Sequence, residues 1–148
     1  MTRPATRLGI FGGTFDPIHF GHVQVAEAVT AALHLDRMLV VVANHPWQKQ
    51  DRPVTPAEDR MAMVVAALAD QPDLEPSRIE LDRGGPSYTV DTVRQLLDAE
   101  PGAELFVVIG ADVVAALDTW HDHERLRELV TLAVVDRPRA AHFDPPDG

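Results

Sequence analysis

Short runs of almost wholly apolar residues alternate along this chain with longer segments that carry a single apolar face. The apolar runs predict five buried strands, at residues 8–11, 38–43, 79–81, 104–109 and 131–135. The longer segments predict helices at residues 21–33, 57–69, 89–99, 111–117 and 124–129. Strands that alternate with helices form βαβ units, and such units build a parallel sheet with helices on both faces. The sequence therefore predicts a doubly wound, Rossmann-like α/β fold with five parallel strands.

Proline and capping residues mark the helix and domain boundaries. Thr55-Pro56-Ala57-Glu58 matches a capping box with proline at the first helical position, which predicts the start of a helix. The stretch from Arg137 onward contains three prolines and no periodicity. A length of 148 residues suits one domain with a hydrophobic core. We expect a single α/β domain over residues 1–139 and an irregular tail over residues 140–148.

The charge and composition of the chain argue against several classes of function. Acidic residues number 23 against 13 basic ones, for a net charge of −10, and no basic run occurs, so a nucleic-acid partner is not expected. No apolar run approaches the roughly 18–20 residues of a membrane helix, so a membrane partner is not expected either. The absence of cysteine and of an apolar leader segment favours the cytoplasm. The sequence leaves homo-oligomer formation open.

The segment after the first predicted strand has the composition of a phosphate-binding loop. It reads Gly12-Gly13-Thr14-Phe15-Asp16-Pro17-Ile18-His19-Phe20-Gly21-His22 and runs into a predicted helix. Ligands of such folds bind beyond the carboxyl ends of the strands. Glycine permits close approach of the backbone, and a helix N-terminus attracts phosphate through its unpaired N–H groups. His19 and His22 lie three residues apart there, so both imidazoles can donate hydrogen bonds to phosphate, more strongly when protonated.

Other interpretations of these histidines stay open at the level of sequence. A glycine loop after a first strand is common in α/β folds, and His19 and His22 are also consistent with ordinary helix-start residues. A metal site would need a third ligand, and none is spaced to join them, so no protein metal site is predicted. His121-Asp122-His123 is a second candidate metal pair, for which a solvated loop is the simpler interpretation.

Several motifs together resemble one enzyme family. Gly-Thr-Phe-Asp-Pro at residues 13–17, followed by His-x-Gly-His at residues 19–22, resembles the signature of adenylyltransferases in the nucleotidyltransferase superfamily. The preceding Gly12 and the histidine at position 19 resemble nicotinate-nucleotide adenylyltransferase; related pantetheine-phosphate adenylyltransferases usually have threonine there. Further matches bring the coverage to about residues 7–139: Pro46-Trp47-Gln48-Lys49, Ser87-Tyr88-Thr89-Val90-Asp91-Thr92, Gly110-Ala111-Asp112 with Trp120, and Arg137-Pro138.

The resemblance implies roles for individual residues on two sides of a site. On the ATP side it implies that Thr14, His19 and His22 are catalytic residues that hold the phosphates. The remaining ATP-binding residues that it implies are Gly12, Gly13, Phe15, Gly21, Gly110 and Asp112, the last two near the ribose. The mononucleotide-binding residues that it implies are Asp16, Lys49, Tyr88, Thr89, Trp120 and Arg137.

Within the mononucleotide set, the resemblance assigns separate tasks. Tyr88 and Thr89 would recognise the pyridine carboxylate, and Trp120 would stack on the pyridine ring. Lys49 and Arg137 would neutralise phosphate. Three alternatives stay open: packing alone for Trp120, a solvated position for Lys49, and a helix N-cap role for Asp112.

The implied reaction joins ATP to nicotinate mononucleotide, giving nicotinate adenine dinucleotide and pyrophosphate in NAD biosynthesis. Magnesium is the implied cofactor, held mainly by the ATP phosphates. Members of the family normally continue into a Ser-Ser-Thr-x-x-Arg segment that binds the triphosphate, whereas this chain has no serine or threonine after Thr131. Millimolar ATP binding is therefore expected. Two alternatives stay open: the same chemistry with nicotinamide mononucleotide or phosphopantetheine as acceptor, and a non-catalytic nucleotide-binding remnant.

Overall fold

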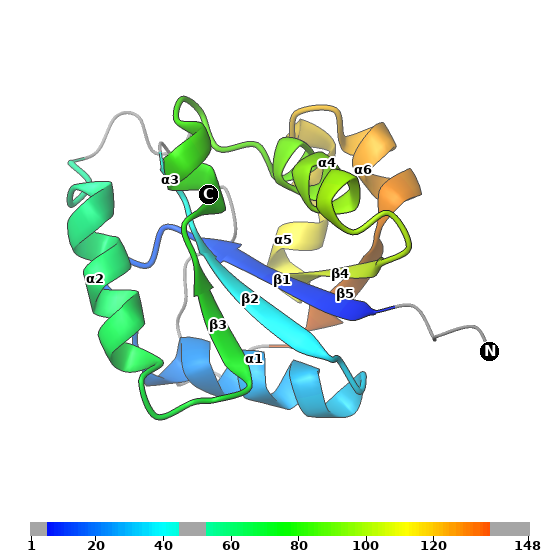
Figure 1. The fold of residues 1–148 in the computed structure, drawn as a ribbon. Helices are drawn as coiled ribbons and strands as arrows, with labels where there is room; N and C mark the ends of the chain where they lie inside the picture. Colours follow the sequence, from blue (N-terminus) through cyan, green and yellow to red (C-terminus); the bar gives the residue numbers. More distant parts are fainter. Residues whose placement is uncertain (1–5, 45–52, 137–148) are drawn as a thin grey trace.

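A five-stranded parallel sheet forms the centre of the molecule, in a computed structural model that describes residues 6–44 and 53–136. The strand order is β3-β2-β1-β4-β5, and every pairing is parallel (Figure 1). The strands are β1 (Arg7–Gly13), β2 (Arg37–Val42), β3 (Leu74–Ser77), β4 (Glu104–Gly110) and β5 (Thr131–Val135). The predicted doubly wound α/β fold is confirmed.

Helices cover both faces of this sheet, with a separate hydrophobic core under each face (Figure 1). The helices are α1 (Phe20–Ala32), α2 (Ala57–Ala67), α3 (Ile79–Arg83), α4 (Thr89–Ala99), α5 (Ala111–Val114), the 3₁₀ turn η2 (Leu117–Thr119) and α6 (His123–Leu129). One core joins the sheet to α1 and α2, and the other joins it to α4 and α6. None of the helices in the described ranges is long and apolar enough to cross a membrane.

The strand order places a potential binding site at the edge of the sheet that the carboxyl ends of the strands form, next to β1. β1 lies between β2 and β4, so the order along the chain reverses at β1. In open parallel sheets, ligands bind beyond the carboxyl ends of the strands at such a reversal. The loop that follows Gly13 of β1 and the turn that follows Gly110 of β4 both begin at this edge. The fold therefore brings the glycine-rich motif to the expected place.

The third strand lies earlier in the chain than the sequence predicted. Residues 79–81 form part of α3, and the strand is Leu74–Ser77, which pairs with β2 from Met38 to Val41. Pro76 is tolerated because β3 is an edge strand, where a missing N–H costs no ladder bond on the open side. The prediction of a strand at 79–81 was wrong because three residues carry too little periodicity to separate a strand from a helical turn.

Two helix boundaries also differ from the sequence prediction. Pro56 is the N-cap of α2, and no side chain caps that helix, so the predicted capping box at Thr55 is wrong. The main chain of Thr55 is engaged elsewhere: its N–H donates to Asp16 Oδ2 at 2.9 Å and its carbonyl accepts from Arg60 Nε at 2.7 Å. The helix predicted over residues 111–117 ends at Val114, and η2 follows it.

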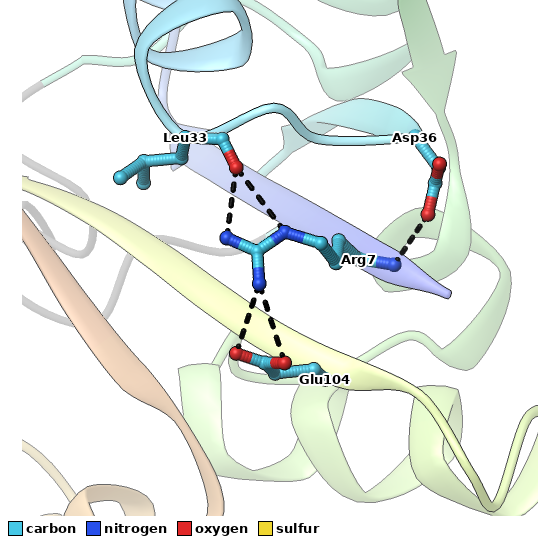
Figure 2. Close-up of polar contacts among 4 residues, drawn as sticks. All are labelled: Arg7, Leu33, Asp36 and Glu104. Atoms are coloured by element: carbon cyan, nitrogen blue, oxygen red, sulfur yellow. Dashed lines mark hydrogen bonds and ion pairs between the residues drawn. The ribbon is translucent and has the colours of Figure 1, made fainter. Parts of the chain in front are cut away.

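Arg7 lies at the opposite edge of the sheet, which the amino ends of β1 and β4 form, and it links the neighbouring segments there (Figure 2). Its guanidinium donates twice to the carbonyl of Leu33, from Nη2 at 2.8 Å and Nε at 3.2 Å, and Nη1 contacts Glu104 Oε1 at 3.3 Å. The guanidinium carbon lies 4.7 Å from the centroid of the Phe106 ring. The main-chain N–H of Arg7 donates to Asp36 Oδ2 at 2.7 Å. These contacts tie the end of α1 to β1 and β4 on the side away from the glycine-rich motif.

Candidate active site

The loop after β1 is anchored by aromatic side chains. Phe15 is buried and has a φ of 51°, a left-handed conformation that is rare for a large side chain. Its ring packs edge-on against Phe11, with centroids 5.6 Å apart, and against His22, with centroids 5.0 Å apart. A Cβ on Gly13 would lie 3.2 Å from the Phe15 ring, so a larger residue there would require the ring to shift by a few tenths of an ångström. The loop is thus held in one conformation from inside the protein.

The two histidines of the motif cap the first turn of α1 reciprocally. His19 is the N-cap, and its Nδ1 accepts from the N–H of Gly21 at 3.2 Å. His22 lies three residues later, and its Nδ1 accepts from the N–H of His19 at 2.9 Å. The two rings are stacked, with centroids 3.8 Å apart. An Nδ1 that accepts from a backbone N–H carries no proton, so each neutral ring carries its proton on Nε2.

This hydrogen bonding changes the expected chemistry of the histidines. Protonation of either ring would require a proton on Nδ1 and would break the bond from the backbone. In this arrangement any donation to a ligand would come from the Nε2–H groups of the neutral rings, whereas the sequence suggested stronger donation by protonated rings. Both donors belong to the first turn of a helix, where the backbone already favours an anion.

Thr14 carries a buried hydroxyl at the start of the same loop. The residue is 1% exposed, and its Oγ1 has no hydrogen-bond partner within residues 6–44 and 53–136. A buried hydroxyl without a partner costs about 1–3 kcal/mol, so such a group calls for an explanation. An oxygen of a bound phosphate would supply the missing partner.

Arg60 of α2 is a functional candidate that the sequence analysis missed. It is 1% exposed, and its guanidinium donates to the carbonyls of Thr14, Ala43, Asn44 and Thr55. Burial lowers the pKa of Arg60 below its ordinary value, and the negative charge of Asp16 opposes that shift. One sequence signal was present, because Arg60 lies on the helix face that buries Met61 and Val64.

The segment that contains Ser87, Tyr88 and Thr89 is tied to the end of β2. Ser87 Oγ accepts from the N–H of Asn44 at 2.8 Å, and Asn44 Nδ2 donates to the carbonyl of Gly85 at 3.0 Å. Gly85 and its neighbour Gly84 have φ values of 71° and 74°, which few other residues adopt without strain. The structure therefore brings the Ser-Tyr-Thr motif and the segment after β2 together, as a shared site requires.

Glu80 of α3 is a buried carboxyl behind that segment. It accepts hydrogen bonds from the hydroxyls of Thr92 and Ser87, and Arg83 Nη1 donates to Thr92 Oγ1 at 3.1 Å. Burial raises the pKa of Glu80, and these two hydroxyl bonds oppose the shift. Glu80 falls within the strand predicted at residues 79–81, and the sequence pattern indicated no role for it. Its position shows that it orients Ser87 from inside the protein.

Tyr88 and Trp120 lie on the α4 side of the sheet. The Tyr88 ring stacks on His121, with centroids 4.2 Å apart and planes 20° apart. Trp120 is 4% exposed and belongs to the core under α4 and α6. Thr89 begins α4 and is also buried. Packing therefore accounts for much of the Trp120 surface, and stacking of Trp120 on a ligand stays a prediction.

The turn after β4 contains the two residues predicted to meet the ribose. Gly110 is the N-cap of α5, and Asp112 is the second residue of that helix. The alternative of an N-cap role for Asp112 is therefore wrong, and its carboxylate is on an exposed residue. The other two predicted cationic residues, Lys49 and Arg137, lie outside the described residues, as do Pro46-Trp47-Gln48, Pro138 and the predicted tail at 140–148.

Metal binding by side chains alone finds no support in the described part of the chain. Residues 6–44 and 53–136 contain no group of three or more His, Asp or Glu side chains that could hold a metal ion. In the candidate pair at residues 121–123, the intervening Asp122 instead accepts from Arg94 at 2.8 Å.

An apolar groove of about 740 Å³ lies beside α1, away from most of these residues. Its lining includes Val25, Val29 and Val135, and Gly21 is the one residue it shares with the predicted site. An apolar wall offers few donors to a polyphosphate, so the groove is not the phosphate site.

Comparison with known proteins gives consistent relatives. A model of the cytidylyltransferase-like family matches residues 10–147. A protein of Corynebacterium kroppenstedtii named probable nicotinate-nucleotide adenylyltransferase is 52% identical over 89% of this chain and 63% of its own length. A protein of Streptomyces coelicolor with the same name is 49% identical over 86% of this chain and 68% of its own length. The chain thus spans about two thirds of the length of these relatives.

A solved structure shares the fold at low sequence identity. It is Plasmodium falciparum nicotinic acid mononucleotide adenylyltransferase complexed with NaAD. The TM-score is 0.77 at 17% identity, over 94% of this chain and 68% of that one. This likeness extends the agreement from sequence to three-dimensional arrangement.

Proposed function

Because the chain belongs to the cytidylyltransferase-like family, we propose that it transfers the adenylyl group of ATP to nicotinate mononucleotide. The products are nicotinate adenine dinucleotide and pyrophosphate, as in NAD biosynthesis. The observation that carries the proposal is the pair of stacked histidines at the start of α1. The Nδ1 of each ring accepts from a backbone N–H, which leaves the single ring proton of each histidine on its own Nε2. The names of the relatives support the choice of acceptor.

The reaction is a direct displacement at phosphorus. A phosphate oxygen of the mononucleotide attacks the α-phosphorus of ATP, and the bond between that phosphorus and the oxygen that bridges to the β-phosphorus breaks. Pyrophosphate leaves with the electron pair of that bond, so no covalent enzyme intermediate forms. The protein contributes orientation and stabilisation of charge.

On the ATP side, three side chains would hold the phosphates. The Nε2–H groups of His19 and His22 would donate to phosphate oxygens, and the hydroxyl of Thr14 would gain the partner it lacks among the described residues. Main-chain groups of Gly12, Gly13, Phe15 and Gly21 would approach the phosphates closely. Gly110 and Asp112 would meet the adenosine ribose, because a carboxylate accepts well from sugar hydroxyls.

On the mononucleotide side, the residues that the sequence resemblance implied would bind the substrate. Tyr88 and Thr89 would recognise the pyridine carboxylate, with Trp120 beside the ring. Asp16 would line the same side, and Lys49 and Arg137 would neutralise the phosphate. The bond from Asn44 to Ser87 supports this grouping, since it joins the segment after β2 to the segment with Tyr88.

Magnesium is the cofactor of the proposed reaction, and ATP is its ligand. We place the ion mainly on the phosphate oxygens of ATP. When bound, it would neutralise charge on the triphosphate and on the leaving pyrophosphate.

Pyrophosphate release tests this function and its acceptor together. The protein is incubated with ATP, magnesium and one of three acceptors: nicotinate mononucleotide, nicotinamide mononucleotide or phosphopantetheine. We expect the highest kcat/KM with the nicotinate form. An equal or reversed ratio between the acid and the amide would overturn the acceptor, and no pyrophosphate with any acceptor would overturn the activity.

A further inference from the structure

Arg60 is a buried cation with no direct part in the reaction described above. Its Nη1 donates to the carbonyls of Ala43 at 2.6 Å and Thr14 at 2.9 Å. Its Nε donates to the carbonyl of Thr55 at 2.7 Å, and its Nη2 contacts the carbonyl of Asn44 at 3.3 Å. One planar guanidinium therefore holds three separate stretches of main chain at once.

Two of these three stretches belong to the two sides of the proposed site. Thr14 begins the loop after β1 that carries the histidine motif. Ala43 and Asn44 begin the segment after β2, which is bound to Ser87 and so to the Ser-Tyr-Thr motif. The two stretches are also joined by one main-chain bond, from the N–H of Ala43 to the carbonyl of Gly13 at 2.9 Å. Arg60 and this bond join the two sides just beyond the end of the β1–β2 ladder, whose last pair is Gly13 and Val42.

Asp16 closes the same network from the other direction. Its Oδ2 accepts from the N–H of Thr55 at 2.9 Å, and the carbonyl of Thr55 accepts from Arg60. The loop after β1 is thus connected to α2 through Asp16 as well as through Thr14. The negative charge of Asp16 also opposes the lowering of the Arg60 pKa that burial causes.

We propose that Arg60 is a positioning residue that sets the separation between the ATP side and the mononucleotide side of the site. The inference rests on the proposed function. A direct displacement requires the attacking oxygen and the α-phosphorus to be aligned at close range, and a misplacement of about 1 Å can cost about 100-fold in rate. Each side keeps its own ligand contacts when the separation changes, so the loss falls on kcat and not on either KM.

The test compares two arginine-to-lysine variants of the same chain. Arg60→Lys keeps the charge but removes the planar fork. Arg7→Lys is the matched control, because Arg7 also donates twice to a main-chain carbonyl, at the edge of the sheet away from the site (Figure 2). Both variants are assayed at a temperature at which circular dichroism shows them folded, with kcat and both KM values measured.

We expect Arg60→Lys to lower kcat by about 10- to 100-fold while both KM values stay within about threefold of the parent. Arg7→Lys should lower the melting temperature and leave kcat within about twofold. A role in stability alone would make the two variants alike, with a lower melting temperature and unchanged kcat. That result, or a loss confined to one KM, would overturn the proposal.

Amide hydrogen exchange decides the inference independently of activity. In Arg60→Lys the N–H of Ala43 should exchange at least about tenfold faster, relative to the N–H of Val107 in β4, because the bond to Gly13 is no longer supported. In Arg7→Lys that ratio should not change. An unchanged ratio in Arg60→Lys would overturn the inference, whereas absence of pyrophosphate from the parent protein would overturn only the proposed function.

Discussion

At the level of single residues, the two histidines of the motif take their chemistry from main-chain groups. The N–H of His19 and the N–H of Gly21 each occupy an Nδ1, so the tautomer of each ring follows from the helix cap. A helix start that contained His19 and His22 in another backbone arrangement would not orient their Nε2–H groups in this way. Capping by these two side chains and the catalysis proposed for them therefore depend on the same backbone arrangement.

Substitution of His22 separates these two properties. Glutamine at this position can still accept from the N-cap N–H, as in an ordinary capping box, but does not place a donor where Nε2 lies. We expect His22→Gln and His22→Ala each to lower turnover by about 100- to 1,000-fold. His22→Ala should also lose about 1 kcal/mol of unfolding free energy, the size of a lost cap. Urea titrations and steady-state assays would measure both, and normal turnover in folded His22→Gln would contradict the assignment.

Thr14 gives a prediction in which stability and binding move in opposite directions. Valine has the same shape but lacks the hydroxyl that stays without a partner among the described residues. We expect Thr14→Val to raise the free energy of unfolding by about 1 kcal/mol and to weaken ATP binding by about 10- to 100-fold. Thr14→Ser, which keeps the hydroxyl, should bind ATP much more like the parent. Calorimetry measures the ATP affinity of both variants. If Thr14→Val bound ATP as tightly as the parent does, Thr14 would not belong to the site.

The predictability of the site differs from residue to residue for physical reasons. The glycine-rich motif was visible because it combines unusual residues within one loop. Arg60 was not, because its four acceptors come from segments up to 46 positions away, and backbone carbonyls leave no mark in a sequence. Glu80 was hidden in a similar way, since its partner Thr92 lies on α4 and its partner Ser87 lies on the turn before α4.

At the level of elements, continuous apolar runs predicted the fold well. β2 and β4 are buried on both faces, so their sequences are apolar almost throughout. β3 lies at the edge and contains a glutamate and a proline, and its sequence does not resemble a buried strand. Glu75 nevertheless belongs there, because its carboxylate accepts from Arg37 Nε at 2.8 Å across the strand pair. Tertiary contact, and not local pattern, determines that element.

The packing of α3 against α4 gives a prediction about pH. Burial raises the pKa of Glu80 above that of the unfolded chain. The folded state therefore binds this proton more tightly, and the resulting contribution to stability is complete below the unfolded pKa and is lost as pH rises through the folded pKa. Glutamine has the same shape and no charge. We expect Glu80→Gln to be stabilised relative to the parent at pH 7.5 by more than at pH 5.

The measurement is urea unfolding of the parent and Glu80→Gln at several pH values. Taking the difference between the two proteins removes the contribution of every other titrating group. A difference that is independent of pH, or that grows as pH falls, would show that Glu80 titrates normally in the folded protein.

At the level of the whole molecule, the sheet separates two cores that share no buried residue. Val64 of α2 lies in one and Val93 of α4 in the other, and both are fully buried. We expect Val64→Ala and Val93→Ala each to cost about 2 kcal/mol of unfolding free energy. The double variant should show the sum of the two losses to within about 0.5 kcal/mol, because the sites have no common partner. A larger deviation in chemical denaturation would mean that the two cores are coupled through the sheet.

The most direct measurement of the central proposal follows oxygen atoms through the reaction. Nicotinate mononucleotide with ¹⁸O in its phosphate is incubated with unlabelled ATP and magnesium, and both products are analysed by mass spectrometry. Attack on the α-phosphorus predicts a labelled dinucleotide and pyrophosphate that contains no label. Label in the pyrophosphate, or no dinucleotide at all, would contradict adenylyl transfer by this chain.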